Sequence, residues 1–123
     1  MSNVIATNLI DRVSGESTPM LNAVKGTAKA WGNFDGTTTP LTIRDAYNIL
    51  GITDNGTGSY FATFETPMPD TSYSVVGSSL YAGVSATHFM APQVPTVNGF
   101  DVITVNPSGS VSDSNFISVS VFK

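Results

Sequence analysis

The sequence predicts an all-β protein, an antiparallel β-sandwich of the jelly-roll kind with a short N-terminal arm. From Gly26 onward, strand-like apolar segments recur about every ten residues and are separated by turn-forming residues. Only 11% of the residues are charged, whereas Ser, Thr, Asn and Gly are abundant. That composition suits strands and turns better than helices. A chain of 123 residues is long enough for one domain with one core.

Residues 1–25 differ from the rest, because their apolar residues follow neither the period of a strand nor that of a helix. We therefore expect an N-terminal arm at residues 1–25 and a β-sandwich domain at residues 26–123. Two placements are open: an irregular strand on its own domain, or an extension that docks on a neighbouring subunit or an underlying lattice. The arm residues expected at such a capsid or subunit interface are Val4, Ile5, Leu9, Ile10, Met20 and Leu21.

Turn signals place the strands. Asp35-Gly36 ends the first, and the run from Asp54 to Gly58 ends the second. Pro67 stops the third, because proline cannot donate to a ladder, and Asn98-Gly99 is typical of a hairpin turn. The last strand is expected in the middle of a sheet. The expected strands are 27–34, 41–52, 60–65, 73–79, 80–84, 87–90, 100–105 and 116–122.

Several positions inside these strands carry predictions of their own. Residues 43–50 have a helical turn as an alternative, but Tyr47 and Ile49 favour a strand. Gly32 stands where a larger residue is expected, which indicates a close backbone approach or a bulge. The aromatic residues expected in the core are Trp31, Phe34, Phe61, Phe64, Phe116 and Phe122.

No motif in the sequence is typical of an enzyme. His88 is the only histidine, and no Gly-x-Ser-x-Gly elbow accompanies it. The only glutamates are Glu16 and Glu65, and their spacing does not place them in one cleft. Asp54-Asn55-Gly56 is typical of a turn, not of a calcium loop, and the chain has no cysteine. We expect no catalytic residue, no metal site and no cofactor.

Charge and hydropathy exclude two classes of partner. A net charge of -4 with only five basic residues does not suit nucleic acid or an anionic membrane surface. No apolar run approaches the length of a membrane span, and the first residues do not form a signal peptide, so we expect synthesis in the cytosol. The candidates for a ligand or receptor loop lie in or beside the irregular stretch 80–95, with ordinary packing as the alternative: Tyr81, His88 and Phe89.

Five segments, taken in order, resemble the small β-domain of tailed-bacteriophage virion proteins. They are Ala28-Lys29-Ala30-Trp31-Gly32-Asn33-Phe34-Asp35-Gly36, Ile43-Arg44-Asp45-Ala46-Tyr47-Asn48, Ile52-Thr53-Asp54-Asn55-Gly56-Thr57-Gly58-Ser59-Tyr60, Met68-Pro69-Asp70-Thr71-Ser72-Tyr73 and Ile117-Ser118-Val119-Ser120-Val121-Phe122. The resemblance covers residues 26–123. It implies a homotrimeric binding module without catalytic residues, at the end of a tail fibre or on a capsid surface.

Fibre-tip members of that group follow a long shaft, whereas this sequence begins with a short apolar arm, which favours the head. We expect a non-enzymatic capsid decoration or cement protein that binds and stabilises the head shell. Its partners would be itself, as a homotrimer, and the major capsid protein, and its location the virion, assembled in the host cytoplasm. The alternative is a receptor-binding tip or short tail-fibre protein that recognises a host surface glycan through loops 80–98.

Overall fold

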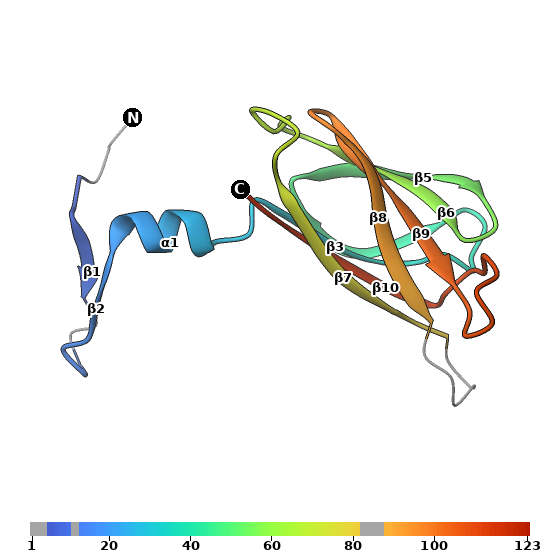
Figure 1. Ribbon diagram of the computed structural model, residues 1–123, viewed down its shortest axis with the longest axis horizontal. Coiled ribbons are helices and arrows are strands. Elements are labelled where there is room, and N and C mark those ends of the chain that lie inside the picture. Colours follow the sequence, from blue (N-terminus) through green and yellow to red (C-terminus); the bar gives the residue numbers. More distant parts are fainter. Residues whose placement is uncertain (1–4, 11–12, 82–87) are drawn as a thin grey trace.

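A computed structural model describes residues 5–10, 13–81 and 88–123. The sandwich is built from β3 (Ala30–Asp35), β4 (Thr42–Tyr47), β5 (Ile49–Gly56), β6 (Ser59–Phe64), β7 (Ser74–Leu80), β8 (Phe89–Thr96), β9 (Gly99–Val105) and β10 (Phe116–Phe122). Two four-stranded antiparallel sheets, ordered β4-β3-β10-β7 and β5-β6-β9-β8, pack face to face (Figure 1). The antiparallel β-sandwich predicted from the sequence is confirmed. β10 lies between β3 and β7, so its expected central position is also confirmed.

The core lies between the two sheets and is filled by alternate residues of the inner strands. On β6, Tyr60, Ala62 and Phe64 are buried while the residues between them are half-buried. The rings of Phe34 and Tyr60 meet edge to face with centroids 5.3 Å apart, which links the two sheets. The buried hydrophobic set is Ala30, Phe34, Tyr60, Ala62, Phe64, Met68, Phe100, Val102, Ile117, Val119 and Val121.

The prediction that all strand aromatics are core residues is confirmed only for Phe34 and Phe64. Trp31 is 37% exposed and Phe116 is 44% exposed. Both alternate with buried neighbours, so they point to the outer face of the first sheet, which no other described element covers. Phe34 and Phe64 are buried as predicted. Phe61 and Phe122 are half-buried and also point outward, since they alternate with the buried residues of β6 and β10.

Residues 41–52, expected as one strand, form two strands that belong to different sheets. β4 ends at Tyr47 and β5 begins at Ile49, so the chain crosses the sandwich at Asn48. Asn48 has φ of 52°, in the left-handed region that asparagine tolerates better than most residues. Its amide donates to the carbonyls of Lys29 and Thr66, and its Oδ1 accepts from Thr66 N at 2.7 Å. The prediction of strand in this region is confirmed, but the prediction of one continuous strand is wrong.

We expect Asn48→Ala to lower the free energy of unfolding by about 2 kcal/mol, because it removes these hydrogen bonds and disfavours the positive φ. Asn48→Gly loses the same hydrogen bonds but accepts this φ, so it should be more stable than the alanine variant by about 1 kcal/mol. Urea unfolding of both variants measures the difference. Equal stability of the two variants would show that the backbone conformation at this position contributes nothing.

Gly32 shows both features that were predicted for it as alternatives, a close approach and a neighbouring bulge. The β3–β4 register shifts between Asn33 and Phe34, which is a bulge beside Gly32. A Cβ placed on Gly32 would lie 3.0 Å from Ile49 Cδ1, so the residue is a point of close approach. Glycine here lets a side chain from the second sheet pack against the first.

β8 is longer than the expected short strand at 87–90. It forms an edge strand, where Pro92 and Pro95 do not interrupt a central ladder. A register shift between Gln93 and Thr96, with Val94 at φ of 37°, bends its end. Residues 82–87 lie outside the described part, so most of the expected strand 80–84 falls there, while Leu80 ends β7.

The arm contains a small hairpin and a helix. β1 (Asn8–Ile10) pairs with β2 (Ser17–Pro19), and α1 (Met20–Gly26) follows and contacts both strands. The sequence did not predict this helix, because seven residues make only about two turns and show too little periodicity. The arm lies to one side of the sandwich and not across it, and the C-terminus lies close to the junction (Figure 1).

Candidate functional site

The outer surface of the sheet β4-β3-β10-β7 is exposed and carries an ordered polar network, and we call it the first-sheet face. Register places Tyr47, Trp31, Ser120 and Val76 in one row across the four strands. Short hydroxyl side chains of β7 and β10 lie between the apolar ones. The outward residues that make up the face are Trp31, Asn33, Asp35, Arg44, Asp45, Tyr47, Ser74, Val76, Ser78, Leu80, Phe116, Ser118, Ser120 and Phe122.

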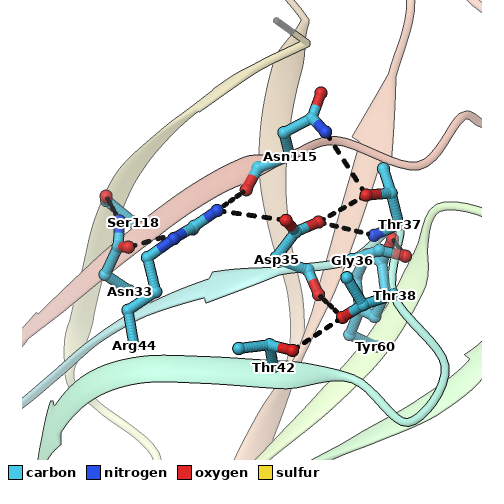
Figure 2. A network of polar contacts seen from close by, with 10 residues as sticks. All are labelled: Asn33, Asp35, Gly36, Thr37, Thr38, Thr42, Arg44, Tyr60, Asn115 and Ser118. Carbon is cyan, nitrogen blue, oxygen red and sulfur yellow. Dashed lines mark hydrogen bonds and ion pairs between the residues drawn. The ribbon is translucent and has the colours of Figure 1, made fainter.

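Arg44 is the centre of a polar network on this face (Figure 2). Its guanidinium donates to Asn33 Oδ1 at 3.1 Å, to Asp35 Oδ2 at 3.1 Å and to the carbonyl of Asn115 at 2.7 Å. The same group lies 4.3 Å from the centroid of the Phe116 ring. The bulge in the β3–β4 ladder makes Arg44 an extra residue opposite β3 and turns it outward. The arginine is thereby neutralised and held flat on the sheet.

The network continues into the loop that follows β3. Asp35 Oδ1 accepts from the backbone N–H of Thr37 at 2.9 Å and from its hydroxyl at 2.6 Å. The Asn115 amide donates to the Thr37 hydroxyl at 3.3 Å, and Thr38 donates to Thr42 at 2.9 Å (Figure 2). These bonds fix the loop that follows β3 against the start of β10. The polar edge of the first-sheet face is therefore preorganised.

A second polar cluster lies beneath the loops at the same end. Asp113 Oδ1 accepts from Gly58 N at 2.7 Å and from the Tyr60 hydroxyl at 2.8 Å. Burial, and then the Asp113 carboxylate, raise the pKa of Tyr60 far above its usual range. The Thr104 hydroxyl donates to the carbonyl of Ser112 at 2.6 Å. These groups hold the 106–115 loop to the sandwich.

The structure brings together two of the three predicted ligand-loop residues. The Tyr81 and His88 rings stack with centroids 5.4 Å apart, and buried His88 Nδ1 lies 2.7 Å from Ser114 Oγ. Phe89 does not join them. It pairs with Val105 and is 60% exposed on the outer face of the second sheet. Ligand binding at these residues stays a prediction.

Most of the predicted arm residues present their side chains to solvent. Ile5 is 97% exposed and Leu21 is 64% exposed. Leu9 and Ile10 are also exposed, and Met20 is half-buried. Val4 lies outside the described residues. The arm thus displays apolar side chains that its own sandwich does not cover.

A hollow of about 640 Å³ lies where the arm joins the sandwich. Its two lysines are already engaged: Lys29 donates to the carbonyl of Val24, and Lys123 pairs with Asp70 at 2.7 Å. The hydrogen bond from Lys123 is the main cause of a lowered pKa at Asp70. The lining is Lys29, Tyr47, Asn48, Glu65, Thr66, Pro67, Met68, Pro69 and Lys123.

Sequence reasoning missed the first-sheet face because it placed Trp31 and Phe116 in the core. The available signal was the alternation of each with small or β-branched neighbours, such as Ala30 and Gly32 around Trp31. Arg44 was recognised only as part of the family resemblance. Its four contacts depend on a bulge that no local pattern announces.

Within residues 5–10, 13–81 and 88–123, no three His, Cys, Asp or Glu side chains are grouped so as to hold a metal ion. No helix among these residues is long and apolar enough to cross a bilayer. No protein-family model, curated protein or solved structure matches the sequence or the fold.

Proposed function

We propose that this protein is a non-enzymatic structural component of a tailed-phage virion, a trimeric capsid decoration protein that binds and stabilises the head shell. The observation that carries the proposal is the arm, whose exposed Ile5, Leu9, Ile10 and Leu21 stand clear of the sandwich. Burying apolar surface is worth about 25 cal/mol per Å². An arm with this surface is suited to adhesion. The assignments to a phage and to a trimer rest on the family resemblance of residues 26–123.

In this proposal the sandwich is a rigid body and the arm is the adhesive element, toward the shell and toward neighbouring copies. Three arms in one trimer would contact the major capsid protein at several points. Linked contacts raise the overall affinity well above that of one arm, because later contacts form within the same complex. A decoration protein of this kind needs no catalytic group.

We expect deletion of residues 1–25 to weaken binding to capsids at least about 100-fold, because several apolar side chains lose their contact surface. Co-sedimentation of the purified protein with expanded empty capsids measures the binding. Leu50→Asp is the matched control, since it places a charge at an exposed apolar position outside the arm. Undiminished capsid binding by the shortened chain would contradict the role of the arm.

The alternative is a receptor-binding tip that recognises a host surface glycan. The observation in its favour is Tyr81, which is 38% exposed and stacks on buried His88, since an exposed aromatic ring is a common platform for sugars. β7 ends and β8 begins at the end of the sandwich opposite the arm (Figure 1). Binding to host cells or glycan arrays that is lost in Tyr81→Ala, with no affinity for capsids, would favour this alternative over decoration.

A further inference from the structure

We propose that the N-terminal arm of one copy docks on the first-sheet face of a second copy. The inference deepens the proposed function and rests on it in one respect, that the arm is an association element. It adds the surface that receives the arm and the identity of the partner, another molecule of the same chain.

The joint between arm and sandwich explains why a second copy is needed. The Thr27 hydroxyl donates to the carbonyl of Ala23 at 2.5 Å, and the Lys29 ammonium donates to the carbonyl of Val24. The backbone N–H of Lys29 also donates to the carbonyl of Val121 at 2.7 Å. The end of α1 and the start of β3 are therefore tied to each other and to β10. This joint directs the arm away from its own sandwich, as Figure 1 shows.

One part of the first-sheet face, formed by Trp31, Tyr47, Phe116 and Arg44, carries the residue types that protein interface cores favour. Such cores are poor in free charge and rich in aromatic residues and arginine. Here Trp31 and Tyr47 are directly opposite each other on β3 and β4, and Arg44 is neutralised by Asp35 at 3.1 Å. The side chains of Arg44 and Asp35 are already only 32% and 16% exposed, so a covering surface removes little of their remaining hydration.

The size of the face favours an arm over a second sheet as its occupant. Four strands about 4.8 Å apart and about 21 Å long present roughly 400 Å². Two such faces pressed together would bury about 800 Å², half of a standard stable interface of about 1,600 Å². An arm can follow the face and continue along its edges. The apolar side chains that it brings include Ile5, Leu9, Ile10, Leu21 and Val24.

An arm on a neighbour's face is a heterologous contact, in which each copy donates one arm and receives another. Repeated contacts of this type close into a ring when the rotation permits. A ring of three copies would give the trimer of the proposed function. Every first-sheet face would then receive an arm, and the side of each arm turned away from that face would be left for the shell.

The first test compares oligomeric mass by light scattering after size-exclusion chromatography. The full chain should be an oligomer, with a mass at least twice the 12.9 kDa of one chain. An arm variant, Leu21→Asp with Val24→Asp, and a face variant, Tyr47→Asp with Val76→Asp, should both run as monomers, with dissociation constants raised at least 100-fold. The control, Leu50→Asp with Phe89→Asp, changes exposed apolar residues of the second sheet and should keep the oligomer.

Mixing the two monomeric variants is the decisive step. The arm variant keeps an intact face and the face variant keeps an intact arm, so together they form one good contact and should give a dimer of one copy of each. Face-to-face or arm-to-arm association predicts no such rescue. A monomeric full chain, an oligomer that survives both double substitutions, or a mixture that stays monomeric would each overturn the proposal.

A second measurement keeps the test sharp if an aspartate variant folds poorly. The chain has no cysteine, so introduced thiols have no native competitor. Leu21→Cys mixed with Val76→Cys under mild oxidation should give a covalent mixed dimer, while Leu21→Cys mixed with Leu50→Cys should not. Equal crosslinking in the two mixtures would contradict docking on the first-sheet face.

These results separate the inference from the proposed function. An oligomer that persists without the arm, together with loss of capsid binding, would end the inference and leave decoration standing. An arm-dependent oligomer that binds no capsid would support the inference and remove decoration.

Discussion

Gly58→Ala is expected to lower the free energy of unfolding by roughly 3–5 kcal/mol, through left-handed strain and overpacking together. Gly58 has φ of 64° in the β5–β6 turn. A Cβ there would lie 2.6 Å from both Ser112 N and Thr104 O, which are backbone atoms that cannot rotate away. The substitution would also strain the bond from Gly58 N to Asp113. Thermal unfolding followed by circular dichroism should show a midpoint lower by about 10–20 °C.

Gly109→Ala is the matched control for this effect. Gly109 also has a positive φ, of 86°, but a Cβ there would meet no atom within 4 Å. Gly109→Ala should therefore lower the free energy of unfolding by about 1 kcal/mol, which is the effect of the left-handed backbone alone. Similar losses in the two variants would show that close packing at Gly58 does not matter, and that the 106–115 loop can move aside.

Tyr60→Phe is expected to cost about 2 kcal/mol at neutral pH and to flatten the loss of stability in alkali. The hydroxyl donates to Asp113 at 2.8 Å from a fully buried position, so its removal leaves the carboxylate with one fewer donor. Burial and the nearby carboxylate raise the pKa of Tyr60 in the folded state. The stabilisation is therefore complete below the unfolded pKa, near 10, and is lost as pH rises above it.

Urea midpoints at pH 8, 10 and 11 measure this dependence. In the wild type, Tyr60 removes about 1.4 kcal/mol per pH unit above pH 10, as long as it is ionised in the unfolded state and protonated in the folded state. Tyr73, whose pKa is also raised by burial, should leave a residual slope in the Tyr60→Phe variant. Tyr47→Phe, at an exposed position, serves as the control. An unchanged alkaline slope in Tyr60→Phe would refute the assignment of this effect to Tyr60.

The hairpins were predictable because their signals are local. Asn98-Gly99 closes β8 onto β9, and the run Asp54 to Gly58 closes β5 onto β6, where Gly56 and Gly58 adopt positive φ. The crossing at Asn48 was not predicted. A single left-handed residue separates β4 from β5, and apolar residues continue on both sides of it. Tertiary packing, and not the local sequence, decides to which sheet β5 belongs.

The candidate surfaces were predicted less completely than the fold. The irregular pattern of the arm left open whether it lies on its own domain or extends to a neighbour, and the structure leaves Leu9, Ile10 and Leu21 exposed. The Arg44 network was not predicted, because it joins residues from β3, β4 and the loop before β10. Aromatic residues alone do not reveal which face of a strand is covered. That depends on which layers the fold stacks.

The position of the arm on β3 has a mechanical consequence. Tension on the arm enters the sandwich at Lys29 and runs along β3, which is paired with β10 on one side and β4 on the other. Ladder hydrogen bonds are perpendicular to the strands, so this pull loads them in shear and all at once. An arm attached to a free edge strand would instead peel one bond at a time. A sandwich held by its arm would therefore resist a pulling force through two ladders in parallel.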